Sequence, residues 1–362
     1  MPIIIYIFFL TGYIYEDNDS LIVENDSLVI CGNHHYNLKV HLSNGARLKI
    51  SFWNGIDSTG KLILWAPYIY CHGSMIEGTG SGYSGGTNTH PDGYGPGCGY
   101  AGISGGGGGG AYGGAGGEGG DVNPGSGGVP YGNTIDTIVN MGSGGGAGRL
   151  GAVDGFGGNG GGLISLLGNK IVIDSSLIQA DGMRGNDGSY EAGGGGSGGG
   201  IKIQSDTLRI RNTSIFAKGG NGGDGEGGGG GGAGGGRIKF FFTILDTNNI
   251  NLSAGGGNGG YGGYGNGEDG TAGTIYFGSL VTAEEKILIN YLDFSLKPII
   301  TNGKFIISFK DNCKVLLIYD IRGCLVKSLK VNKEVDVGDL RSGIYFLRIP
   351  DEYRLIKFIL IK

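Results

Sequence analysis

The sequence is poor in proline, tryptophan and charge: its 362 residues include 8 prolines, 2 tryptophans and 16 % charged side chains. Collagen is excluded, because a triple helix needs a strict Gly-X-Y repeat with abundant proline. No stretch combines clustered basic residues with interleaved aromatics, so nucleic acid is not an expected partner. The glycine runs do not end in Gly-Lys-Ser or Gly-Lys-Thr, which excludes a Walker phosphate loop.

Cysteine and histidine are scarce, and their spacing gives no metal framework. The 5 cysteines contain no C-x-x-C motif, and an odd count leaves at least one thiol unpaired within the chain. Cys313 and Cys324 are close enough in sequence to bridge a hairpin in an exported protein. No acidic or cysteine framework accompanies His34, His35 and His41, so we expect solvated turn histidines. We expect neither a metal nor a cofactor.

Glycine is abundant instead. Of 85 glycines, 75 lie between Gly73 and Gly273, and the segment 160–277 repeats itself every 37 residues. Such a period indicates a solenoid or array. The repeat places like side chains in columns: Ile164, Ile201, Ile238 and Ile275; Leu166, Ile203, Phe240 and Phe277; Ile171, Leu208 and Leu245; Ile178, Ile215 and Leu252; Ala180, Ala217 and Ala254.

Each repeat has two halves. The first runs about 17 residues, as in 201–217, and alternates apolar with polar side chains, which is typical of half-buried strands. These strands are too short to enclose a core alone, so we expect them to stack coil upon coil. The fold class predicted is all-β: a parallel β-helix solenoid with 37-residue coils and glycine-rich, polyglycine II-like loops, followed by a small antiparallel β-sandwich.

The second half is almost pure glycine, and its order is an open question. A flexible linker is one reading. The constant spacing of 21 residues from Ala180 to Ile201 and from Ala217 to Ile238 favours stacked helices instead. From 182 to 188, glycine also recurs at every third position, which matches the three-residue turn of a polyproline II-type helix. The loops must therefore hydrogen-bond one another or remain mobile.

An earlier copy of the repeat begins near residue 60 and carries a much longer glycine-rich loop. Leu62 matches Ile164 at a distance of 102 residues, so this loop, 80–160, exceeds the others by 65 residues. Long insertions on one face of a solenoid are often binding surfaces. The candidate binding residues are its tyrosines, which could instead pack between glycine strands: Tyr83, Tyr94, Tyr100, Tyr112 and Tyr131.

Acidic residues in the loops raise the question of calcium and of catalysis. Asp187 and Asp224 occupy equivalent positions, but the apolar residue that calcium-binding β-roll repeats require does not follow them. Polysaccharide-cleaving enzymes need paired carboxylates, or a base beside acids, on one face. The best cluster is Asp206 with Arg209 and Arg211, which reads as the outer face of a strand. We expect no catalytic site and no calcium site.

The domain organisation follows from these shifts. Residues 1–15 form an apolar run that is too short to span a bilayer, and they are expected to be a signal peptide, with a buried first strand as the alternative. Residues 16–59 are read as opening coils or a cap, and 60–283 as the glycine-rich body with its insertion at 80–160. The body is similar to glycine-rich parallel β-helix regions of bacterial surface proteins. Its loops alone resemble the stacked polyglycine helices of phage tail-tip adhesins.

Residues 284–362 form a separate module with sparse glycine and several alternating strands. Segments 315–329, 335–349 and 357–362 resemble the C-terminal sorting domain of the type IX (Por) secretion system. One departure is that the usual opening Pro-Asn-Pro is replaced by Lys297-Pro298-Ile299. The residues that carry the resemblance are Tyr319, Asp320, Gly323, Leu340, Gly343, Ile344, Tyr345 and Lys357.

The resemblance implies export by the type IX machinery to the extracellular or outer-membrane surface. The predicted function is therefore a secreted, non-catalytic structural or adhesive surface protein, with surface glycans or matrix as partners. Two alternatives stay open. One is a β-helix that binds or cleaves polysaccharide, and the other is a subunit that self-associates into an extracellular filament or matrix.

Overall fold

The computed structural model describes residues 12–150 and 152–280, and in the C-terminal part 295–297, 300–301, 304–308, 314–321, 324–331, 334–337, 339–349 and 354–360. The expected signal peptide therefore lies largely outside the described residues. The chain divides into two compact units, Met1–Leu280 and Val281–Lys362. Every regular element described is a β-strand, so the protein is all-β, as the alternating pattern predicts.

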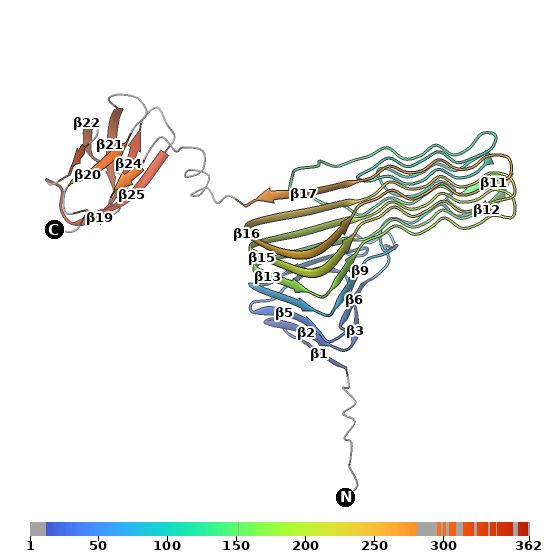
Figure 1. Ribbon diagram of the computed structural model, residues 1–362, viewed down its shortest axis with the longest axis horizontal. Coiled ribbons are helices and arrows are strands. Elements are labelled where there is room, and N and C mark those ends of the chain that lie inside the picture. The colour runs from blue at the N-terminus through green and yellow to red at the C-terminus, as the bar shows by residue number, and fades with distance from the viewer. Residues whose placement is uncertain are drawn as a thin grey trace, which may run out of the picture. The chain divides into compact units, whose positions relative to one another are not determined.

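The first unit is built on a 14-stranded sheet in which every pairing except β1 with β2 is parallel. Its strands are β1 (Tyr13–Glu16), β2 (Ser20–Glu24), β3 (Ser27–Ile30), β4 (Gly32–His35), β5 (Lys39–Ser43), β6 (Arg47–Ile50), β7 (Lys61–Trp65), β8 (Tyr68–His72), β9 (Met75–Glu77), β13 (Leu163–Asp174), β14 (Leu177–Gln179), β15 (Gly200–Phe216), β16 (Arg237–Ser253) and β17 (Thr274–Ser279). Neighbouring strands in the sheet are mostly not consecutive in sequence: Figure 1 shows β5 beside β2, and β3, β6 and β9 in a column of their own.

Strand register follows the repeat in the sequence. Ile164 lies opposite Ile201, which lies opposite Ile238, which lies opposite Ile275. Leu62 lies opposite Ile164, as the earlier copy of the repeat predicts. The predicted columns are therefore observed. Each apolar side chain buried in them contributes roughly 1.5–3 kcal/mol to stability.

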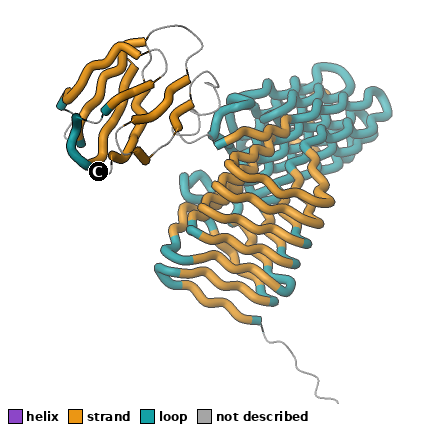
Figure 2. Tube along the Cα trace, turned by 60° about the vertical axis from the view of Figure 1, so that its left-hand side comes forward, coloured by secondary structure: helices purple, strands orange, loops and turns teal. Residues whose placement is uncertain are grey.

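The strands form three parallel stacks around one core. One stack runs β4–β7–β13–β15–β16–β17, the second β2–β5–β8–β13–β15–β16, and the third β3–β6–β9–β14–β15–β16. The long strands β15 and β16 bend through all three. Inward side chains such as Ile201 and Ile238 are 0 % exposed. Figure 2 shows the stacked strands on one side and the loops that leave them on the other.

The glycine runs are hydrogen-bonded to one another, which is the first of the two alternatives raised by the sequence. In the run 106–111, consecutive N–H groups donate to three different neighbours, and the direction repeats every third residue. Gly107 and Gly110 donate to Ala192 and Gly195, whereas Gly106 donates to Gly120. Since the strand columns alone could not order so much glycine, this mutual bonding is what orders the loops.

The long insertion is part of the glycine layer. Gly110 donates its N–H to Gly195 and accepts one from Gly234, so a run of the insertion lies between the loops of two later coils. Short strands β10 (Ser104–Gly105), β11 (Gly148–Leu150) and β12 (Ala152–Gly155) form a separate three-stranded sheet within it. The insertion is therefore structural along much of its length.

Backbones in this layer approach too closely for side chains. A Cβ built on Gly194 would lie 2.0 Å from the carbonyl oxygen of Gly108, far inside van der Waals contact. At Gly255, on the last coil, the nearest atom would be 3.6 Å away. Glycine is thus required by the neighbouring chains in the interior of the layer, and much less so at its edge.

The C-terminal unit contains a three-stranded and a five-stranded sheet. The strands are β18 (Ser295–Lys297), β19 (Ile300–Thr301), β20 (Lys304–Ser308), β21 (Lys314–Asp320), β22 (Leu325–Val331), β23 (Glu334–Asp336), β24 (Gly343–Ile349) and β25 (Arg354–Leu360). Pairing is antiparallel except between β19 and β25. The sequence shows alternating runs at 305–309, 315–319, 344–349 and 356–361, which correspond to β20, β21, β24 and β25. The strands β18, β19, β22 and β23 were not predicted.

Candidate binding surfaces and the sorting domain

Two of the five candidate tyrosines support the insertion from inside. Tyr112 is 0 % exposed, and its hydroxyl accepts the N–H of Asn140 at 2.7 Å. Its ring centroid lies 4.8 Å from that of Tyr131, whose hydroxyl donates to the carbonyl of Met141. Burial raises the pKa of Tyr112 to about 12 and also raises the pKa of Tyr131. Tyr112 is therefore out of reach of a ligand, and Tyr131 uses its hydroxyl within the insertion.

Two other tyrosines join an aromatic cluster at the start of the insertion. The ring of Trp53 lies 5.1 Å from Tyr83 and 5.4 Å from Tyr94, measured between centroids. His90 stacks on Tyr94 at 4.1 Å. Trp53, Tyr83 and Tyr94 are half-buried and His90 is exposed, so solvent reaches part of the cluster. We call these four residues the Trp53 cluster.

No pattern in the sequence indicates that Trp53 or His90 belongs to this cluster. Trp53 precedes the repeat copy at residue 60 and is brought to the insertion by a backbone hydrogen bond, from its N–H to the carbonyl of Ser81 (3.0 Å). The fifth candidate, Tyr100, stands apart at 52 % exposed and makes no aromatic contact with the described residues. The five tyrosines therefore fall into three environments.

A buried pair of cations holds the segment 131–138 against strand β16. The ammonium of Lys239, 0 % exposed, has four oxygen atoms within 2.7–3.0 Å, including Oδ1 and the carbonyl of Asp136. Arg237 donates to the carbonyls of Tyr131 and Gly132. The hydrogen bond from Lys239 lowers the pKa of Asp136. Lys239 and Arg237 are therefore structural, and we call the pair the cation clamp.

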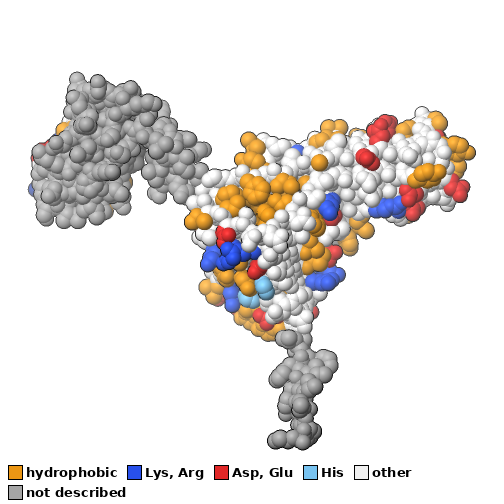
Figure 3. Space-filling model, in the orientation of Figure 1, with side chains coloured by type: hydrophobic (Ala, Val, Ile, Leu, Met, Phe, Trp, Pro, Cys, Tyr) orange, Lys and Arg blue, Asp and Glu red, His pale blue; other side chains and the backbone are white. Residues whose placement is uncertain are grey.

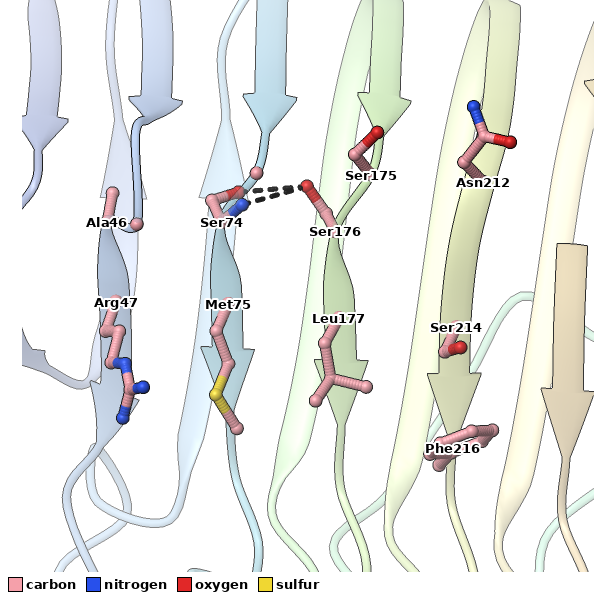
Figure 4. Close-up of a pocket in the computed structure, with 12 residues that line it drawn as sticks. Ala46, Arg47, Ser74, Met75, Ser175, Ser176, Leu177, Asn212, Ser214 and Phe216 are labelled. Atoms are coloured by element: carbon pink, nitrogen blue, oxygen red, sulfur yellow. Dashed lines mark hydrogen bonds between the residues drawn. The ribbon is translucent and has the colours of Figure 1, made fainter.

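A shallow groove of about 470 Å³ crosses four coils at the corner that precedes β6, β9 and β14 (Figure 4). Gly45 and Gly73 line the groove without side chains that would fill it. Met75, Leu177 and Phe216 form an apolar side. The polar groups are mostly occupied: the hydroxyls of Ser74 and Ser176 lie 3.2 Å apart, and Ser176 donates to a backbone carbonyl. The groove thus offers shape and apolar contact, with Arg47 as its cation.

The basic residues of the candidate enzyme cluster are engaged by another acid. Asp246 of β16 lies 3.5 Å from Arg209 and 2.8 Å from Arg211. Asp206 is exposed at the bend of β15. The arginine charges are therefore directed along the stack, towards the next strand, and not towards Asp206.

The loop acids and the histidines also pair with protein groups. Arg184 bridges Asp187 at 2.6 Å and Asp224 at 2.8 Å. His34 lies 3.7 Å from Glu16, and the His35 ring lies 4.1 Å from that of Trp65. Within the described ranges, no group of three or more His, Cys, Asp and Glu residues is arranged to hold a metal ion.

Cysteine chemistry is limited in the part of the chain that the structure describes. Cys31, Cys71, Cys98 and Cys324 are free thiols there. Burial raises the pKa of Cys71 to about 12, so this residue is an inert core side chain. The hairpin bridge considered for Cys313 and Cys324 involves Cys313, which lies outside the described residues.

The sorting motif residues gather around β21 and β24. Tyr319 lies opposite Phe346 and Asp320 opposite Tyr345 in the antiparallel pair. Asp320 accepts the N–H of Cys324 at 3.0 Å and closes the turn after β21. The hydroxyl of Tyr345 donates to the carbonyl of Arg341 at 2.8 Å.

The remaining motif positions lie nearby in the same sheet or its turns. Leu340 donates its N–H to Val337 in the turn before β24, Gly343 and Ile344 begin β24, and Lys357 lies in β25 opposite Phe346. Gly323 lies outside the described residues.

Residues 298–362 match the family described as the secretion system C-terminal sorting domain. The C-terminal module is therefore a type IX sorting domain, and the match begins at Pro298, where the opening motif departs from the usual one. A search of curated proteins and a search of solved structures each found no match. The described residues contain no helix long and apolar enough to cross a membrane.

A sorting domain of this kind implies that the protein is secreted through the type IX system to the cell surface or the extracellular space. It also implies that the chain interacts with the type IX machinery during export.

Proposed function

We propose that this protein is a secreted, non-catalytic scaffold or adhesin whose body is a parallel β-helix solenoid with 37-residue coils. The observation that carries the proposal is that the strands and the glycine runs both stack with the same 37-residue period. Strands pair at a 37-residue offset, and so do the glycine runs, as when Gly185 and Gly222 each donate to the following coil. The direction of the hydrogen bonds repeats every third residue, which supports polyglycine II-like helices.

Such a body is suited to mechanical and adhesive work. Backbone-to-backbone bonding in several directions gives a stiff layer without side chains, and rigid scaffolds commonly present binding residues on their loops. The Trp53 cluster is the best candidate for contact with a surface, because Trp and Tyr supply large contact areas at low entropic cost. Surface glycans or matrix are the proposed partners.

The proposal can be tested with the purified full chain. Binding to a glycan array and to immobilised cell-surface material is measured for the wild type, W53A and Y94A. Tyr112→Phe serves as a matched control, since it alters an insertion tyrosine that solvent does not reach. If W53A and Y94A lose binding and Tyr112→Phe does not, adhesion through the cluster is supported. If all four proteins bind equally, adhesion through the cluster is rejected.

A polysaccharide-binding β-helix is the second candidate, and the groove in Figure 4 favours it. The groove runs across parallel strands spaced about 4.8 Å apart, so a linear polymer lying along it would meet a similar surface at each coil. Cleavage is a weaker proposal because Asp246 engages Arg209 and Arg211. A reducing-sugar assay on array hits separates binding from cleavage, and activity lost in D206A would favour the enzyme.

Filament formation by stacking of coils is disfavoured by the ends of the layer. In inner coils, the N–H groups of Gly185 and Gly222 bond to the next coil; in the last coil, the equivalent Gly259 donates to Oδ1 of Asp269 at 2.8 Å. Oδ1 of Asn266 accepts the N–H of Gly262 in the same way. A side-chain cap has thus replaced the next coil.

The strand half of the last coil is less covered. Ile275 and Phe277 are 41 % and 43 % exposed. Figure 3, in the orientation of Figure 1, shows apolar side chains gathered over the region of β16 and β17. Electron microscopy of the purified protein tests whether this patch nevertheless joins copies.

A further inference from the structure

A carboxylate from a coil meets an acidic residue of the insertion inside the glycine layer. Glu191 is 0 % exposed, and its Oε2 accepts the N–H of Gly228 at 2.9 Å. Its other oxygen, Oε1, is buried without a hydrogen-bond donor. A Cβ built on Gly228 would lie 2.5 Å from Oε2 of Glu191 and 2.5 Å from the carbonyl oxygen of Gly120, so the insertion passes directly beside this carboxyl. The next residue, Asp121, interacts with it and is itself an acceptor when ionised.

The meeting point is where the insertion crosses the outer turns of the coils. Gly120 donates its N–H to Gly229, and a Cβ on Gly265 would lie 2.5 Å from the Asp121 nitrogen. Asp121 has a φ of 73°, a conformation that costs a non-glycine residue energy. The backbone thus holds the Asp121 carboxyl beside Glu191 despite local strain.

Asp154 and Tyr190, which lie beside Glu191, are themselves acids and cannot neutralise the pair. Asp154 of β12 accepts the N–H groups of Tyr190 and Glu191, and these bonds lower its pKa against the effect of burial. Tyr190 lies beside Glu191 in the same turn. Strand β11 approaches through Gly148, whose Cβ position lies 2.4 Å from the Glu191 carbonyl oxygen, and Arg149 follows it.

We propose that Glu191 and Asp121 share one proton and form a pH-sensitive latch between the insertion and the coils. With the proton bound, one carboxyl donates to the other, and every oxygen of Glu191 has a partner. When the proton leaves to solvent, the buried Glu191 carboxylate faces the half-buried Asp121 carboxylate, and the two repel. The latch is therefore closed in acid and loosened as pH rises.

The direction of titration agrees with this geometry. Burial first, and then the negative charges of Asp121 and Asp154, raise the pKa of Glu191 above its usual value of 4.5. The folded protein therefore binds a proton that the unfolded chain releases. The stabilisation is fully present below about pH 4.5 and is lost as pH rises through the higher folded pKa.

The test compares the wild-type chain with E191Q and D121N. In E191Q, the amide carbonyl still accepts from Gly228 and the amide N–H₂ can donate to Asp121, so the shared proton is not needed. We expect E191Q to raise the melting temperature at pH 7.5 by roughly 2–4 °C, and the difference to disappear below about pH 4.5. D121N should do the same, and E226Q, an exposed acid in the neighbouring turn, should do neither.

Hydrogen exchange at pH 7.5 gives a local readout. Peptides that cover 119–128 should exchange more slowly in E191Q than in the wild type, with E226Q matching the wild type. The proposal is overturned if E191Q lowers the melting temperature at pH 7.5 as well as in acid. It is also overturned if millimolar Ca²⁺ at pH 7.5 stabilises the wild type and not E191Q, because the pair would then hold a cation and not a proton.

Discussion

Asp187 and Asp224 occupy the same place in successive coils, and Oδ1 of Asp187 accepts the backbone N–H of Asp224 at 2.8 Å. Asp224 in turn accepts the N–H of Tyr261 at 2.7 Å. Asn221 and Asn258 repeat the arrangement at 2.9 Å. Acidic and amide side chains in the loops therefore bind the next coil, a role that the sequence pattern alone did not indicate.

Removing this acceptor should weaken the glycine layer modestly. D187A loses the bond to Asp224 and the ion pair with Arg184, and because the site is largely exposed we expect a cost of about 0.5–1.5 kcal/mol. D187N keeps an acceptor oxygen, so its cost should be smaller. Chemical denaturation of the two variants measures the difference. Equal losses in both would show that the charge, and not the hydrogen bond, stabilises the layer.

The same residue predicts a pH dependence opposite to that of Glu191. The hydrogen bond from Asp224 is the largest influence on Asp187 and lowers its pKa below 3.8. Its contribution is therefore present above about pH 3.8 and is lost as pH falls through the lower folded pKa. Thermal melts of wild type and D187A should converge in strong acid and separate as pH rises.

Glycine should be required inside the layer and dispensable at its edge. G194A places a methyl group 2.0 Å from the Gly108 carbonyl oxygen, which forces the insertion away from the coil. We expect insoluble protein or a loss of more than about 3 kcal/mol. G255A meets nothing closer than 3.6 Å and should lie within about 1 kcal/mol of wild type.

Solubility and denaturant midpoints of the two variants check this. If G194A is as stable as G255A, the layer is not close-packed, and limited proteolysis within the run 219–236 should then cut folded protein readily.

The columns of the repeat could be predicted because identical side chains at a fixed spacing have one simple explanation. Ile164, Ile201 and Ile238 can be buried together only if the chain returns to the same place every 37 residues. The order of the loops could not be decided the same way. Glycine has no side chain whose type would indicate what lies beside it. The sequence therefore shows the period of the loops but not which segments bond to one another.

The insertion was harder still. Its runs have no counterpart at the repeat spacing, and the bonds from Gly110 to Gly195 and from Gly234 to Gly110 connect residues without any shared pattern. The tyrosines suggested binding because they stand out among glycines. Whether a ring faces solvent, as in the Trp53 cluster, or the interior, as with Tyr112, depends on contacts that only the fold supplies.

One corner of every coil has a local cause that the sequence hints at. Asn212 and Asn249 have positive φ values of 46° and 52°, and Asn tolerates this region better than most residues. The amide of Asn249 also donates to Oδ1 of Asn212 at 3.0 Å. Gly73 and Ser175 occupy the equivalent position in earlier coils, so residue type alone does not identify the column.

The cation clamp gives a fourth prediction. K239M removes a fully buried ammonium and leaves the carbonyls of Asn133 and Ile138 and the Asp136 carboxylate without their donor. We expect a loss of about 3 kcal/mol or more. Lys202 is the matched control in the same column: burial, then the nearby Lys239, lowers its pKa, so K202M should be neutral or stabilising.

Thermal melts and exchange at 131–138 measure the clamp. If K239M destabilises the protein no more than K202M does, the bonds from Lys239 to the insertion do not stabilise the fold, and the clamp is rejected.

Export gives the prediction that depends on the C-terminal unit alone. In a host with a type IX system, a chain that lacks residues 298–362 should stay inside the cell envelope, and a reporter fused to that segment behind a signal peptide should reach the surface or the medium. The matched control is the same reporter fused to residues 16–283. Immunoblots of medium and of protease-treated whole cells measure both.

The two reporter fusions separate sorting from folding of the body. Because the match covers only 298–362, the segment should direct export whatever precedes it. A full chain carrying G194A should then be sorted less efficiently only to the extent that its body misfolds, whereas the reporter fusion is unaffected by that substitution. If the 16–283 fusion is exported as well as the 298–362 fusion, the signal for export is not confined to the sorting domain.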